Sequence, residues 1–140
     1  MIRSDSLTAD DVKEKALHYL RTAELLLMFS EEDEDYLLDT ANYLRLCLET
    51  FLLSTLKRRG LDIEGVYTIT ATMETAITLD ICTITSWIQQ HGREIDQWYS
   101  CLEYDCEYTL SKESVEEALR EIKYFLEVNN CKWYEPRERT

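Results

Sequence analysis

Two long helical patterns, joined by an acidic run, constrain the fold of this chain more than any other feature. Apolar side chains recur at spacings of three and four residues over residues 12–27, and again over residues 37–56. The run between them, residues 31–35, is Glu-Glu-Asp-Glu-Asp. Because such helices can bury their apolar stripes only against each other and against further helices, the pattern predicts a helical bundle.

The ends of these two helices are marked by residues that commonly begin and end helices. Thr8 is placed to cap the first helix, which should end near Ser30. The second should begin within the acidic run and reach Arg59, with Gly60 as the left-handed residue that ends it. We therefore expect a long antiparallel hairpin.

The third segment, residues 66–87, is rich in Thr and Ile, which favour strands. Its large apolar residues nevertheless recur at steps of four and three, which is helical periodicity; they are Ile69, Met73, Ile77, Ile81, Ile84 and Ile88. We predict one helix that ends near His91-Gly92, and a shorter helix from Arg93 to residue 102 or 104.

A final helix should open at Ser111, or at Ser114, where Ser114 and Glu117 have the spacing of a capping box. It should end around Asn129-Asn130. Together these patterns predict an all-α fold, an up-and-down bundle of four to five helices. We expect one domain over residues 1–130 and a tail over residues 131–140.

Charge and hydropathy exclude several classes of protein. The net charge is −13, which disfavours direct nucleic-acid binding because phosphate backbones are repelled. The one basic run, residues 57–59, fits the C-terminal end of a helix, with a phosphate contact as the alternative. No run of about 18 apolar residues occurs, and the N-terminus does not read as a secretory signal. We expect a cytoplasmic protein without a membrane segment.

Five cysteines, without a Cys-x-x-Cys pair, read as free thiols. Cys101 and Cys106, with His91 upstream, are a weak zinc pattern because paired ligands at tight spacing are missing. We predict no metal site and no cofactor.

Several motifs resemble those of the HEPN (higher eukaryotes and prokaryotes nucleotide-binding) family. The helix patterns Ala16-x-x-x-Leu20-x-x-Ala23-x-x-Leu26 and Cys47-Leu48-Glu49-x-x-Leu52, the latter followed by Leu56 and Gly60, are similar to the family's first two helices. Tyr99, and Tyr104 through Tyr108, resemble the tyrosine-bearing segment before its last helix. The resemblance spans residues 12–129 and implies a HEPN-like bundle, a homodimer, and a protein partner encoded nearby.

Many HEPN proteins are metal-independent ribonucleases with an Arg four to six residues before a His. Neither His18 nor His91 has such an Arg, and Arg93 follows His91. The resemblance therefore assigns no catalytic residue. Two other departures are Leu53, where the family usually has Lys, and Thr70-Ala71-Thr72-Met73, which lacks the family's His.

Six residues remain as candidates for ligand or partner contacts. His91 and Arg93 flank Gly92, and this arrangement reads first as a helix terminus. Glu49 is placed to pair with Arg45 four residues earlier, or to reach across the bundle to Arg93 or a Tyr hydroxyl. An aromatic cluster around the fourth helix suits the core and a subunit interface; its candidates are Trp98, Tyr99 and Tyr104.

Three functions are compatible with these features. The first is a non-catalytic interaction module, as the partner of a nucleotidyltransferase-like protein or part of a defence or toxin–antitoxin system. The second is a diverged ribonuclease that uses Arg93 with His91 or a Tyr. The third is a bundle that binds a nucleotide or another small molecule between its helices.

Overall fold

Helices account for nearly all of the chain that the computed structural model describes, which is residues 8–29, 35–61, 68–103 and 111–129. In these ranges there are five: α1 (Ala9–Phe29), α2 (Asp35–Arg58), α3 (Ile69–Thr78), α4 (Ser86–Glu103) and α5 (Lys112–Val128). The same ranges hold no strand, so the predicted all-α bundle is confirmed. None of the described helices combines the length and the apolar character needed to cross a bilayer.

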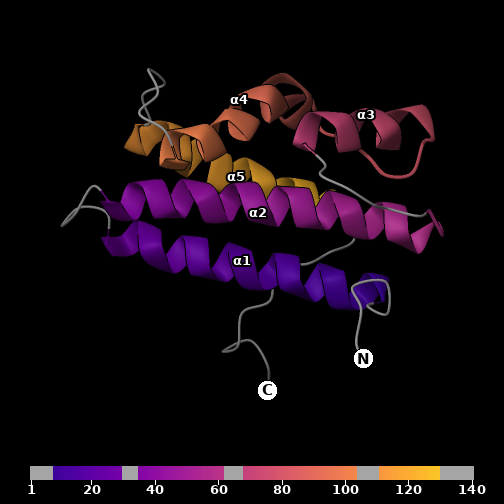
Figure 1. Cartoon of the computed structure of the whole chain (residues 1–140), viewed down its shortest axis with the longest axis horizontal. Coiled ribbons are helices and arrows are strands. Elements are labelled where there is room, and N and C mark those ends of the chain that lie inside the picture. Colours follow the sequence, from indigo (N-terminus) through magenta and orange to yellow (C-terminus); the bar gives the residue numbers. More distant parts are fainter. Residues whose placement is uncertain (1–7, 30–34, 62–67, 104–110, 130–140) are drawn as a thin grey trace.

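Helix α2 is the centre of the bundle. It contacts all four of the other described helices, with α1 antiparallel along one side and α3, α4 and α5 on the other (Figure 1). Its buried positions therefore extend beyond one stripe and include Thr40, Arg45 and Ser54 as well as its apolar residues. The predicted α1–α2 hairpin is present, and α2 supplies the surface on which the other helices pack.

Small side chains allow α1 to lie close to α2. Ala16 and Ala23 of α1 and Ala41 of α2 are all fully buried. Aromatic contacts add to this packing, since the rings of Tyr19 and Tyr43 lie 5.9 Å apart. Across the bundle, α5 is joined to α1 by an ion pair of 2.8 Å between Lys123 and Glu24.

Three helix ends are set by local capping residues at the positions that the sequence predicts. The Thr8 hydroxyl accepts a hydrogen bond from the Asp11 amide at 3.0 Å and so caps α1. Gly60 follows α2 with a φ of +78° and donates its amide to the Lys57 carbonyl at 2.9 Å. Ser111, the first of the two predicted openings, caps α5 in a reciprocal box with Ser114.

The prediction of one continuous third helix is wrong, because α3 ends at Thr78 and α4 begins only at Ser86. Asp80 lies in the left-handed region, with a φ of +53°, which an Asp adopts more readily than most side chains do. The side chain of Asn129 then accepts from the Thr83 amide and donates to its carbonyl, both at 2.9 Å. These bonds replace the helical partners that Thr83 gives up.

The predicted break at His91-Gly92 is also wrong, since both residues lie inside α4. Gly92 is buried where α3 approaches α4: a Cβ added there would lie 3.2 Å from Met73 Cε and 3.5 Å from Ile69 Cγ2. The glycine serves close helix packing and does not end a helix.

The substitutions Gly92→Ala and Gly60→Ala should therefore have different effects on the free energy of unfolding. In α4 the alanine gains about 0.8–1 kcal/mol of helix propensity, while the flexible end of Met73 yields by a few tenths of an ångström. We expect Gly92→Ala to match or exceed the wild-type free energy of unfolding. Gly60→Ala should lower the free energy of unfolding by about 1 kcal/mol, because an alanine is strained at the positive φ of this position. No steric clash adds to this loss, since no described atom beyond the two neighbouring residues lies within 4 Å of the added Cβ. Urea unfolding followed by circular dichroism measures both, and equal losses would contradict the assignment of Gly92.

Candidate functional site

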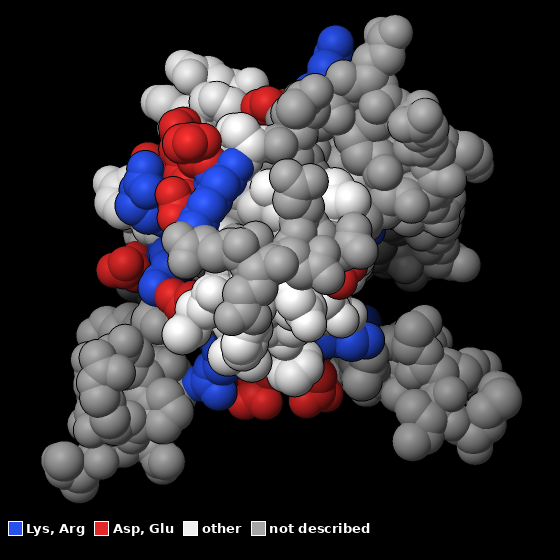
Figure 2. Space-filling view, turned by 90° about the vertical axis from the view of Figure 1, so that its left-hand side faces the viewer, with Lys and Arg blue, Asp and Glu red and all other residues white. Residues whose placement is uncertain are grey.

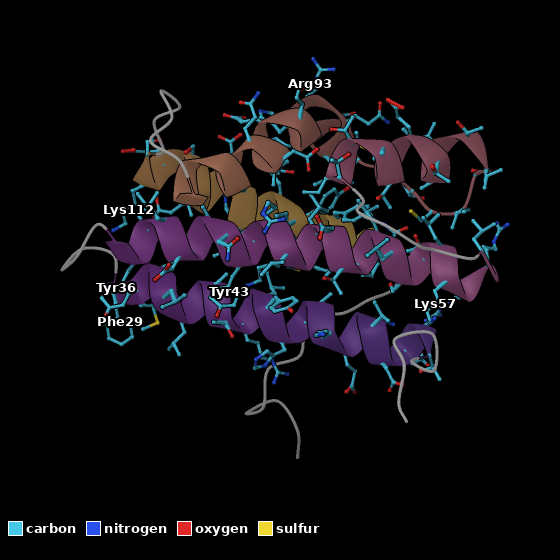
Figure 3. The ribbon with its side chains drawn as sticks, in the orientation of Figure 1. Phe29, Tyr36, Tyr43, Lys57, Arg93 and Lys112 are labelled. Carbon is cyan, nitrogen blue, oxygen red and sulfur yellow. The ribbon has the colours of Figure 1, made fainter. Side chains whose placement is uncertain are left out.

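Glu49 belongs to a chain of polar side chains along α2. Arg45 donates to Glu49 Oε2 at 3.3 Å and to Asn42 Oδ1 at 3.0 Å, so the predicted pairing with Arg45 is confirmed. Arg93 is exposed and points away from the bundle (Figure 3), so Glu49 does not reach it. The side chain of Glu49 is thus held by Arg45, a residue of the same helix.

Asp96 is a polar residue of this region that the sequence reasoning missed. From α4, its carboxylate accepts hydrogen bonds from the Ile69 amide at 2.8 Å, the Thr70 amide at 3.0 Å and the Thr70 hydroxyl at 2.8 Å. These amides are two of the donors left unpaired at the start of α3, where a carboxylate is also favoured by the helix dipole. Asp96 thus fixes the start of α3 against α4.

Burial raises the pKa of Glu49 above its ordinary value, the nearby charge of Asp96 adds to the rise, and Arg45 opposes it. The carboxylates of α2 and α4 therefore interact across the helix interface. Both carboxylates accept hydrogen bonds from groups of the protein. Glu49 accepts from Arg45, and Asp96 accepts from the amides at the start of α3. This cluster organises helices, and it gives no arrangement of an acid and a base around a substrate.

His91 and Arg93 are not brought together as a catalytic pair. The His91 ring stacks on Trp87 with a centroid separation of 4.2 Å, and its Nδ1 lies 2.9 Å from the Trp87 carbonyl. Trp87 in turn donates to Glu117 of α5 at 2.6 Å. His91 is thus held against the α4–α5 contact, whereas Arg93 lies two residues later, where a helix turns the side chain to a different side.

The aromatic candidates are only partly within the described residues. Trp98 is 2% exposed and belongs to the core. Tyr99 lies in α4, but its side chain is outside the described part of the structure, as is the whole of Tyr104. A cavity of about 130 Å³ lies beside Trp98, lined by Trp87, His91, Glu94, Trp98, Ser114 and Glu117.

The clearest candidate for a partner contact is an apolar surface at the turn end of the α1–α2 hairpin, which we call the hairpin-end patch. It consists of Leu25, Met28, Phe29 and Tyr36, whose exposed fractions are 56%, 72%, 44% and 37%. The rings of Phe29 and Tyr36 lie 5.9 Å apart and come from different helices (Figure 3). Seen from this end, uncharged residues occupy the centre of the described surface, and charged side chains gather mainly to the left of them and below (Figure 2).

The sequence carries a signal for the hairpin-end patch. Leu25, Met28 and Phe29 are spaced by three and four residues, which places them on one face of α1. That face differs from the buried stripe of Ala16, Leu20 and Ala23. A second apolar face, on a helix that the other described helices cover mainly on one side, predicts an exposed surface.

Metal binding has no support in the described ranges, where no three His, Cys, Asp or Glu side chains are grouped to hold an ion. Cys106 of the weak zinc pattern lies outside these ranges.

The chain matches no known protein family, no curated protein and no solved structure. The likeness to HEPN proteins therefore rests on the sequence motifs alone.

Asp96→Ala should destabilise the protein by about 2 kcal/mol, since it removes a charged acceptor shared by two backbone amides and a hydroxyl. Urea unfolding measures the loss, and amide exchange at Ile69 and Thr70 should quicken. Gln90→Ala, an exposed change on the same helix, should stay within about 0.5 kcal/mol of wild type. An Asp96 variant as stable as the Gln90 variant would refute the capping role.

Glu49→Gln should change how stability depends on pH. Because burial raises the pKa of Glu49 in the folded chain above its ordinary value of 4.5, the folded chain binds this proton more tightly than the unfolded chain. The stability linked to Glu49 is then full below pH 4.5 and is lost as pH rises through the raised folded value. Glutamine does not titrate, so the variant does not lose this contribution. Its stability relative to wild type should therefore increase as pH rises through the folded pKa of Glu49. Urea unfolding at a series of pH values tests this, and a pH-independent difference would contradict it.

Proposed function

We propose that this chain is a non-catalytic helical interaction module that binds another protein subunit through the hairpin-end patch. The observation that carries the proposal is the exposure of four large apolar side chains at one end of two adjacent helices. Single exposed apolar residues are common on monomers, whereas a contiguous group is typical of a contact surface.

The composition of the hairpin-end patch supports the same function. Aromatic residues and Met are enriched at protein interfaces and charged residues are depleted from their centres. Phe29, Tyr36 and Met28 fit that composition, and Met28 adds a flexible side chain that adapts to a partner surface. The acidic run of residues 31–35 lies in the sequence between Phe29 and Tyr36, so the polar residues next to the patch along the chain are negatively charged, as is the chain as a whole.

A second copy of the chain is the partner we propose, so that two hairpin ends meet in a symmetric homodimer. In such an interface each patch packs on its own equivalent, and no complementary surface is needed elsewhere. A protein encoded nearby, such as a nucleotidyltransferase-like protein or the other half of a toxin–antitoxin pair, is the alternative implied by the HEPN resemblance.

The ribonuclease alternative has less support. General acid–base cleavage needs the catalytic side chains to converge on one reacting group. Arg93 is exposed and directed outward, whereas His91 is stacked on Trp87 and bonded to its carbonyl.

Met28→Glu should separate the proposed dimer into monomers. Met28 is 72% exposed, so the change places a charge in the proposed interface without disturbing the core. Size-exclusion chromatography with light scattering at micromolar concentration should give about twice the 16.6 kDa chain mass for wild type and the single chain mass for the variant.

Tyr124→Glu is the matched control, because Tyr124 is 55% exposed on α5 and receives the same charge outside the hairpin-end patch. It should remain dimeric. A monomeric wild type, or equal dissociation of both variants, would contradict the proposed homodimer.

A further inference from the structure

A cavity of about 300 Å³ lies at the end of the bundle opposite the hairpin turn. It is bounded by the start of α1, the end of α2, the turn between α3 and α4, and the end of α5. This volume is at the lower end of the range for small-molecule sites. The lining residues are Lys13, Phe51, Ser54, Thr55, Arg58, Arg59, Ile81, Cys82, Thr83, Val128 and Asn129.

Among the described residues that line this cavity, the charged ones are all cations, namely Lys13, Arg58 and Arg59. This is unusual for a chain with 28 acidic and 15 basic residues. The carboxylate of Asp10 accepts a hydrogen bond from Arg58 at 2.8 Å, and both side chains are largely exposed. Arg59 donates to the Asp80 carbonyl at 3.2 Å, a contact that keeps its positive charge available.

The side chains of Ser54, Thr55 and Asn129 in the lining are already engaged within the protein. Ser54 and Thr55 each donate a hydroxyl to a carbonyl of α2 at 2.6 Å. Asn129 uses its side chain on Thr83. The polar capacity left for a ligand is therefore chiefly cationic, while Phe51, Ile81 and Val128 supply the apolar part of the wall.

We propose that this cavity binds a small organic anion with an apolar body. Its carboxylate or phosphate group lies among the three cations, and its body packs against the apolar wall. Charge selects the anionic end because a carboxylate or phosphate pairs with Lys and Arg, and burial of the body supplies the remaining affinity. The site is separate from the hairpin-end patch and does not depend on the proposed dimer.

Binding at this site is reversible and non-covalent. Cys82 is the one thiol among the lining residues, and burial raises the pKa of Cys82 above its ordinary value, with a hydrogen bond to Thr55 opposing the shift. Because the thiolate is the reactive form, a raised pKa leaves this cysteine protonated and unreactive near neutral pH.

Titration of the full chain with phenylacetate and phenyl phosphate, followed by amide NMR shifts at constant ionic strength, tests the site. Both anions should shift the amides of Thr55, Cys82 and Thr83. The neutral analogue 2-phenylethanol and inorganic phosphate should each bind about tenfold more weakly, because each lacks one half of the proposed ligand. The ratio of the two dissociation constants then shows whether the site prefers a carboxylate or a phosphate.

Substitution of lining cations tests whether the positive charges of the cavity contribute to binding of the anions. The double variant Lys13→Ala, Arg59→Gln should weaken both anions about fivefold, as expected for partly exposed charge pairs. Lys15→Ala, an exposed cation two residues from Lys13 and outside the lining, should leave both dissociation constants unchanged.

Three results would overturn the proposal: no binding of either anion at millimolar concentration, equal binding of 2-phenylethanol, or equal weakening by Lys15→Ala. Met28→Glu should retain anion binding, so failure of the proposed dimer and failure of this site give different results.

Discussion

Burial of α2 on both of its sides is the constraint on which the rest of the bundle depends. A helix with one apolar stripe needs one partner, whereas α2 carries buried residues around most of its circumference and contacts all four other described helices. The alanines at 16, 23 and 41 bring α1 close on one side. On the other side Phe51 meets Phe125 of α5 edge to face, at 5.4 Å. Because most helix stability comes from tertiary packing, each remaining helix is ordered by what it buries against α2.

The short helix α3 shows how the bundle stabilises an element that would be marginal alone. Ten residues are too few for a stable isolated helix in water. Asp96 supplies a carboxylate to its first amides, and Gly92 leaves room for Met73 and Ile69. Both residues belong to α4, so α3 and α4 depend on each other for their placement. Neither contact involves a reacting group, which accords with a structural role for this region.

The features predicted correctly from the sequence are those set by neighbouring residues. Thr8, Gly60 and Ser111 act within one helical turn, and Arg45 with Glu49 is a pair four residues apart. The break after Thr78 was missed because the isoleucine spacing continues through it, while Asn129 stabilises the turn from 46 residues away. Gly92 was misplaced because a helix stop and a close packing contact both favour glycine. Asp96 was missed because the amides it caps lie on a different helix.

The two surfaces proposed for binding lie at the two ends of the α1–α2 hairpin and differ in character. Tyr36 of the hairpin-end patch lies in the first turn of α2. Arg58, which lines the cavity proposed to bind an anion, is the last residue of the same helix. Coupling between them requires an element with two discrete arrangements. A shift of α2 along its axis would displace close-packed side chains on both of its sides, which is costly in a core of this kind. The α2 helix therefore holds the two proposed surfaces at a fixed separation, so binding at one should leave the other unchanged.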